Sequence, residues 1–211
     1  AVSYAGQRQS VGIATGKVRP GAPLRFSVNL RPDVGTGQSY LFDGVMAEGA
    51  DITGQLKGRP ARSREGTGDA ELDLRPLSLR ADVKANFDRV ELDKIEIAPD
   101  GAADAGNLLT GAAQIRLGSQ IGLDTQLKAA KLDLDGMMGA RARQSFYNGE
   151  AFSLLSSLLF NLPDGFTSRF SLAVTSLVLG GESVDGFSIS GEAAQDKLKI
   201  TRMEASMPGQ T

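Results

Sequence analysis

The feature that most constrains the fold of this chain is an alternation of apolar and polar residues that recurs along much of its length. Every second side chain is apolar in residues 24–30, 77–83 and 113–117 and, apart from Thr125, in residues 121–127. A period of two places successive side chains on opposite faces of an extended strand. The chain is therefore predicted to be mainly β, with strands that have one apolar and one polar face.

The alternation slips by one residue at four places. Val90 and Leu92, for example, are followed by Ile95 after two intervening residues rather than one. A slip would turn the later side chains to the opposite face unless a bulge restores the phase and bends the strand. The sequence thus predicts repeated, bulged antiparallel strands that form a curved sheet or trough. The bulges or bends are expected near Asp93–Lys94, Ala130–Lys131, Thr175–Ser176 and Thr201–Arg202.

The slipped strands fall into two similar units, at about 87–136 and 170–209, and repetition on this scale is typical of stacked architectures. The chain begins with Ala1, and we interpret residues 1–211 as one β-rich segment of a longer protein. Its predicted parts are N-terminal strands at 1–57, a loop at 58–69, a first repeat region at 70–136, a helical insert at 137–165 and a second repeat region at 166–211.

The insert between the repeats has a different periodicity. Ala151, Leu154, Leu155 and Leu158 lie at helical spacing, and the turn-forming residues 163–165 follow them. We predict a short helical insert around 137–162 that packs on the apolar face of the sheet as a plug or lid. A helix lying on a membrane surface is the alternative, although few lysines and arginines are present to support it.

Composition removes several classes of function. The chain has no cysteine and no histidine, which excludes zinc–thiolate sites, disulfides and Ser-His-Asp triads. Its net charge of −2 offers no basic excess for nucleic acid. The longest apolar run, 152–162, is well short of the roughly 20 residues that a bilayer-spanning helix needs. We expect no cofactor, no nucleic-acid partner and a monomeric state.

Carboxylates are the remaining candidates for catalysis or metal binding. Glu91, Asp93 and Glu96 could serve acid–base chemistry in a glycosidase that uses carboxylates alone, but their spacing favours solvated charges on the polar face. Asp133 and Asp135 precede a glycine as in the start of a calcium loop, whose later ligands are missing here. We therefore predict no catalytic residue, no metal site and no enzymatic activity, and keep the glycosidase as a third alternative.

The apolar side chains of the strands are the remaining functional candidate. They can be closed into a core or left as an open groove that holds an apolar ligand. The candidate groove residues come from both repeat regions. They are Ile115, Leu117, Leu123, Leu127, Leu132, Leu134, Phe187, Ile189, Leu198 and Ile200.

Three segments resemble the AsmA family of large Gram-negative envelope proteins. Residues 127–136 (LKAAKLDLDG) are similar to a repeating phrase of that family, in which a strand leads into a short helix. Residues 106–117 resemble the strand that precedes this phrase, and residues 198–209 resemble the family's closing strand. The resemblance extends from about Phe87 to the C-terminal end and is weaker over residues 1–66.

The resemblance implies a periplasmic β-trough that is part of a protein anchored in the inner membrane of a Gram-negative envelope. Such a segment is expected to bind or conduct phospholipid acyl chains along an apolar β-groove, in support of outer-membrane lipid homeostasis. Its other expected partners are envelope proteins of the inner and outer membranes. The alternative is a structural or scaffolding β-domain that assists outer-membrane assembly without holding lipid.

Overall fold

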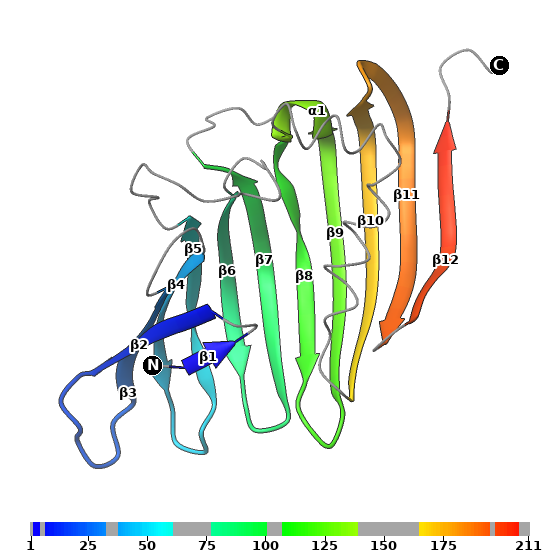
Figure 1. The fold of residues 1–211 in the computed structure, drawn as a ribbon. Helices are drawn as coiled ribbons and strands as arrows, with labels where there is room; N and C mark the ends of the chain where they lie inside the picture. The colour runs from blue at the N-terminus through cyan, green and yellow to red at the C-terminus, as the bar shows by residue number, and fades with distance from the viewer. Residues whose placement is uncertain are drawn as a thin grey trace.

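The computed structural model describes residues 2–4, 7–32, 38–60, 77–100, 107–138, 165–194 and 197–206. These residues form a single sheet of twelve strands and one short helix (Figure 1). The elements are β1 (Val2–Tyr4), β2 (Gln7–Thr15), β3 (Leu24–Pro32), β4 (Gln38–Met46), β5 (Ile52–Pro60), β6 (Leu77–Ala85), β7 (Arg89–Pro99), β8 (Leu109–Arg116), β9 (Ile121–Asp133), α1 (Leu134–Met137), β10 (Phe166–Leu179), β11 (Glu182–Ala194) and β12 (Lys197–Ser206).

The strands lie in the sheet in the order in which they occur in the chain, from β1 to β12. Each strand therefore pairs with its neighbours in sequence, and the sheet has two lateral edges instead of closing on itself. The sheet is strongly curved, and its N-terminal strands turn away from the plane of the others (Figure 1). The prediction of a mainly β fold built as a curved sheet is confirmed.

One pairing differs from the rest. All neighbouring strands are antiparallel except β9 and β10, which run parallel with Leu127 opposite Leu172 and Leu132 opposite Leu177. A parallel pair requires a crossover connection, whereas a hairpin turn suffices for an antiparallel one. The sequence prediction of antiparallel strands did not anticipate this pair. It lies where the chain passes from the first repeat region to the second.

The helical prediction at this junction can be compared with the structure only at its start. Helix α1 begins at Leu134, three residues before the predicted insert, because Asp133 caps it: the Asp133 carboxylate accepts a hydrogen bond from the Gly136 amide at 2.8 Å. A carboxylate at this position satisfies an amide that has no partner within the helix. The remainder of the predicted insert, 139–162, lies outside the described residues.

The cross-strand register gathers the apolar side chains on one face, here called the apolar face. One line of residues, the central row, passes through every strand from β2 to β12. Its neighbours are directly opposed except Ala81 and Ile95, which lie at the register shift between β6 and β7. Strand spacing gives this row a length of roughly 50 Å along the sheet. Its members are Ile13, Val28, Phe42, Leu56, Ala81, Ile95, Gly111, Leu127, Leu172, Ile189 and Met203.

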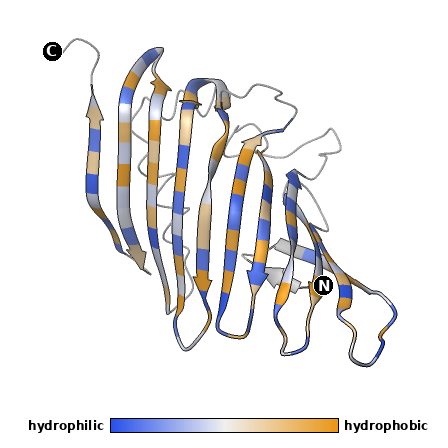
Figure 2. Ribbon diagram, turned by 180° about the vertical axis from the view of Figure 1, so that it is seen from behind, coloured by the Kyte–Doolittle hydropathy of each residue, from blue (hydrophilic) through white to orange (hydrophobic). Residues whose placement is uncertain are grey.

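The opposite face, here called the polar face, carries mostly charged and hydroxyl side chains. Arg80, Asp82 and Lys84 of β6 and Glu91 and Asp93 of β7 lie on it, paired across the two strands. Figure 2 shows the alternation along each strand as hydrophobic and hydrophilic bands. Each strand is thus amphipathic, as the period of two predicts.

Two of the four predicted slips are bulges that shift the register. In β7, Asp93 and Lys94 lie between the pairs Leu92–Ala113 and Ile95–Gly111, so two residues oppose one on β8. Lys94 has φ of 49° there. In β12, Thr201 is the extra residue between the pairs Ser190–Arg202 and Gly191–Ile200. These bulges keep the later apolar residues on the apolar face, which confirms the prediction at both sites.

The other two slips take a form that the sequence did not predict. In β9 and β10 the pairs Ala129–Val174 and Lys131–Ser176 flank the slip with no change of register. Both strands step by one residue at the same level, so the step in one compensates for the step in the other. Buried residues then follow at Leu132 and Leu177, on the same face as Ala129 and Val174.

Glycines on the apolar face lie beneath aromatic rings. A Cβ added to Gly44 would lie 2.5 Å from Cε1 and Cζ of Phe42, and one added to Gly191 would lie 2.8 Å from Cζ of Phe170. Only a residue without a side chain lets the ring lie this close to the backbone. The rings thus take the space that side chains would otherwise fill.

The predicted loop at 58–69 needs a correction at its start, because Gly58, Arg59 and Pro60 belong to β5 and pair with Tyr40, Ser39 and Gln38. The loop was predicted because the segment is rich in arginine and glycine and has no apolar alternation. Gly58 instead lies under the Tyr40 ring, where its Cβ would be 3.1 Å from Cε1, and Pro60 is the last residue of the strand. Residues 61–69 lie outside the described ranges.

The ring-over-glycine packing predicts the effect of a matched pair of substitutions. Gly44→Val should lower the free energy of unfolding by about 1–3 kcal/mol, because the new side chain displaces the Phe42 ring. Gly12→Val should be neutral or slightly stabilising, since the nearest atoms to its Cβ lie 3.9 Å away and valine favours strands. Urea unfolding of both variants measures the difference, and equal destabilisation would contradict the packing argument.

Candidate functional site

The apolar face is the candidate functional site, and most of the predicted groove residues lie on it. Ile115 opposes Leu123, and Leu127 is connected through Leu172 to Ile189. The others join the same face through their own partners. Leu132 opposes Leu177, Phe187 opposes Val174, Leu198 opposes Ala193 and Ile200 opposes Gly191.

Two of the predicted groove residues lie outside the strands. Leu117 directly follows β8, at the turn into β9, and is exposed. Leu134 is the first residue of α1 and packs against the buried residues of β9 and β10. They therefore occupy the margins of the apolar face.

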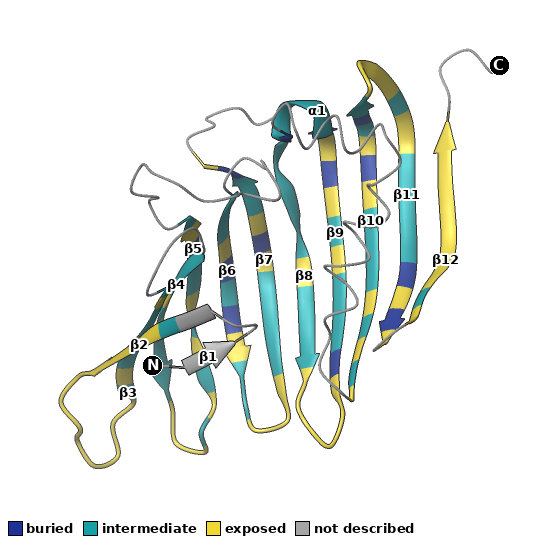
Figure 3. Ribbon diagram, viewed as in Figure 1, coloured by how far each residue is buried: buried dark blue, intermediate teal, exposed yellow. Residues whose placement is uncertain are grey.

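The apolar face is covered at one place within the described residues. Ala129, Leu132, Val174 and Leu177 form a buried cluster, against which Leu134 and Met137 of α1 pack. Met138, directly after the helix, is also buried. Figure 3 shows buried segments of β9 and β10 close to α1. This end of the β9–β10 pair has the character of a closed core.

Carboxylates and an amide hold α1 in place over this cluster. The two carboxylate oxygens of Asp135 accept hydrogen bonds from the amides of Gly180 and Gly181, at 3.1 and 2.8 Å. Asn107 Oδ1 accepts a bond from the Asp133 amide at 2.6 Å. The acidic pair that resembles the start of a calcium loop therefore holds the helix and the β10–β11 turn together.

On the rest of the apolar face, Ala81, Val83, Ile95 and Ala193 are also buried, whereas exposure increases toward the lateral edges of the sheet. Ile13 and Met203, at the two ends of the central row, are 69% and 68% exposed. In the described part of the chain, α1 is the only element other than neighbouring strands that makes extensive contact with a strand. Among the described elements, α1 is therefore the one that covers part of the apolar face.

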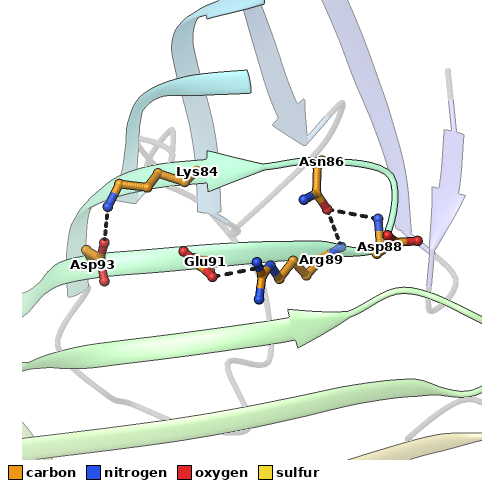
Figure 4. Close-up of polar contacts among 6 residues, drawn as sticks. All are labelled: Lys84, Asn86, Asp88, Arg89, Glu91 and Asp93. Atoms are coloured by element: carbon orange, nitrogen blue, oxygen red, sulfur yellow. Dashed lines mark hydrogen bonds and ion pairs between the residues drawn. The ribbon is translucent and has the colours of Figure 1, made fainter. Parts of the chain in front are cut away.

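The candidate acid–base residues lie on the polar face, away from the apolar rows. Asp93 pairs with Lys84 at 3.1 Å, and Glu91 with Arg89 at 3.4 Å (Figure 4). Glu96 lies 4.0 Å from Arg80. These carboxylates lie along an open strand surface and each has a cationic neighbour, as expected of solvated charges. The described residues contain no group of acidic side chains arranged to hold a metal ion.

One ion pair spans the β7 bulge. Lys94 Nζ lies 3.0 Å from the Asp82 carboxylate on β6. Hydrogen bonding to Lys94 and its positive charge lower the pKa of Asp82, and the same contact raises the pKa of Lys94. The pair links the residue with positive φ to the neighbouring strand. The sequence placed Lys94 among the polar-face charges but gave no sign of its partner.

Comparison with protein-family models, with curated proteins and with solved structures finds no match to this chain. Among the helices of the described residues, none has the length and apolar character needed to cross a membrane.

The Asp82–Lys94 pair predicts a pH-dependent contribution to stability. A lowered pKa for Asp82 means that the pair stabilises the fold above the ordinary carboxyl pKa of about 4 and loses this effect as the pH falls through the folded-state pKa. The pKa of Lys94 is raised, so the pair also loses its stabilising effect at high pH, above the ordinary lysine pKa of about 10. Asp82→Asn should therefore be slightly less stable than the unaltered chain at pH 7 and equal to it well below pH 4.

Urea unfolding at several pH values measures this difference. Asp43→Asn on β4 is the matched control, because Asp43 also lies on the polar face and forms no ion pair with another described residue. It should show a smaller difference between the two pH ranges. If Asp82→Asn stays less stable than the unaltered chain at low pH, the charge of the Asp82 carboxylate does not account for the loss of stability.

Proposed function

We propose that this chain is a non-enzymatic segment that binds or conducts phospholipid acyl chains along its apolar face. The observation that carries the proposal is the central row, an uninterrupted line of apolar or glycine positions across the strands from β2 to β12. No charged residue interrupts it. A continuous apolar path suits a long, flexible apolar ligand better than a compact one.

The physical basis is the transfer of methylene groups out of water. Each methylene that moves from water onto an apolar surface contributes about 0.8 kcal/mol when fully buried. Smooth patches where rings lie over Gly44, Gly58 and Gly191 leave few side chains that would block a chain along the face. Because one such contact resembles the next, a chain could move from strand to strand at little cost.

The resemblance of residues 127–136 to the AsmA family supports the same function and suggests a setting. We propose that the segment is periplasmic, belongs to an inner-membrane-anchored protein of a Gram-negative envelope and supports outer-membrane lipid homeostasis. Envelope proteins of the two membranes are its other proposed partners. The partner lipid and the setting both follow from the resemblance, and the apolar row is the independent structural support for lipid.

A structural or scaffolding β-domain is the second candidate. It is favoured by the buried cluster of Ala129, Leu132, Val174 and Leu177 beneath α1, which has the character of a closed core. If the remainder of the apolar face were closed in the same way, the sheet would assist envelope assembly without holding lipid. The two candidates differ in how the face tolerates a charge.

A charge on the central row separates these candidates. Leu127→Asp or Ile189→Asp should reduce co-purified phospholipid by about tenfold or more, because an unpaired carboxylate is costly to bury under acyl chains. The fold should persist, since water reaches the new charge on an open face. Native mass spectrometry gives the lipid content, and thermal unfolding of the same sample gives the stability.

Gln126→Asp is the matched control, because Gln126 adjoins Leu127 in sequence but lies on the polar face opposite Ala112. It should leave both lipid content and stability unchanged. Unfolding of both apolar-face variants would favour the closed scaffold. Intact fold with unchanged lipid would rule out the conduit.

A further inference from the structure

Four of the nine exposed large apolar side chains among the described residues lie along one rim of the sheet. Phe87 lies in the β6–β7 turn and Val18 in the β2–β3 turn, and they are 79% and 76% exposed. Leu117 and Ile121, which flank the β8–β9 turn, are 40% and 42% exposed. These turns lie at the lower edge of the sheet in Figure 1. We call these four residues the hairpin rim.

The hairpin rim is unusual because hairpin turns normally carry polar residues. Phe87 is moreover held outward by a fixed turn: Asn86 Oδ1 accepts hydrogen bonds from the amides of Asp88 and Arg89, both at 3.0 Å (Figure 4). The amide of Leu117 donates to the Asp88 carbonyl at 2.7 Å. This hydrogen bond joins the β6–β7 turn, which carries the exposed Phe87, to the start of the β8–β9 turn.

The hairpin rim is continuous with the apolar face. Val90, Ile115 and Leu123 oppose one another in the outermost row of that face. Leu117 lies two residues after Ile115, and Ile121 lies two residues before Leu123. Both therefore continue the same alternation, one step closer to the β8–β9 turn. Apolar surface thus extends from the rim to the central row between β7 and β9 without a charged residue in line.

The opposite rim has a different character. There the described residues include Asp100, Asn107, Asp135 and the Gly180–Gly181 turn. None of the exposed large apolar side chains among the described residues lies on that rim. Among the described residues, therefore, the hairpin rim is the one that offers an exposed apolar edge.

We propose that the hairpin rim inserts into the interfacial layer of a phospholipid bilayer and is the edge across which acyl chains pass between bilayer and apolar face. The transfer rests on the proposed function, whereas insertion of the rim is tested separately. Four turn side chains are few for a protein partner, because a stable protein interface buries roughly 1,000 Å². A fluid interface needs no such area, and aromatic side chains favour it.

The charges near the hairpin rim determine which bilayer it suits. Lys17 and Arg19 flank Val18, but Glu48 and Asp51 lie in the adjacent turn and Asp88 beside Phe87. With the two signs mixed, attraction to anionic headgroups is weak. Binding should therefore occur on neutral phosphatidylcholine vesicles and should change little with salt concentration.

A single tryptophan can report insertion, because the chain contains none. Phe87→Trp should show a blue-shifted emission with phosphatidylcholine vesicles and quenching by brominated phosphatidylcholine. Leu41→Trp is the control, because Leu41 is also an exposed apolar residue but lies on the polar face opposite Lys57. It should show neither change. Quenching of both probes, or of neither, overturns the proposal.

A second measurement separates insertion from lipid holding. Phe87→Ser combined with Val18→Ser should weaken vesicle co-sedimentation by about tenfold or more while co-purified phospholipid stays as in the unaltered chain, because neither residue belongs to the groove candidates and the central row is intact. Unchanged co-sedimentation overturns the rim proposal and leaves the apolar face untouched. Loss of co-purified lipid in Leu127→Asp with normal sedimentation of that variant supports two separable surfaces.

Discussion

Cross-strand pairing in register is the constraint on which the other features of this sheet depend. Every strand has apolar residues at every second position, but a shift of one residue between two strands would break the apolar face at that point. The observed pairing connects Ile13 on β2 with Met203 on β12 through opposed residues, apart from the register shift between Ala81 on β6 and Ile95 on β7. Hydrogen bonding between neighbouring strands sets the register locally. Burial of the apolar face favours the observed register over one shifted by a single residue.

The bulges show how this constraint is met in strands whose sequence does not alternate perfectly. At Lys94 and at Thr201 one strand accommodates an extra residue alone, and the register shifts. At Ala130 and Thr175 the two strands step together, and the register is kept. Both solutions bring the later apolar residues back to one face. The alternation could therefore predict where the phase changes, because that information is local. It could not predict which solution is used, because that depends on the neighbouring strand.

The same distinction separates the predictable part of the candidate site from the rest. Strand residues such as Leu127 and Ile189 could be placed on one face from their own spacing. The contact of Asp135 with the Gly180–Gly181 turn joins residues far apart in sequence, and nothing in the local pattern signals it. The parallel pairing of β9 with β10 is equally hidden, because both strands have the same alternation in either direction. Gly58 was predicted to lie in a loop from the arginine- and glycine-rich sequence around it, because its packing partner, the Tyr40 ring, belongs to another strand and leaves no local signal.

The covered and uncovered parts of the apolar face suggest how one sheet can be stable and still offer an open surface. The cluster of Leu132 and Leu177 under α1 supplies a well-buried core at one end of two central strands. The outer strands rely on pairing with their neighbours and on ring-over-glycine packing such as that of Phe42 on Gly44, which buries apolar area without a second layer. A charge at Leu127, two positions from buried Ala129, tests the boundary of the core beneath α1. A charge farther toward β12, at Ile189, tests the open surface beyond it. A greater loss of stability for Leu127→Asp than for Ile189→Asp would therefore locate where the core ends and the groove begins.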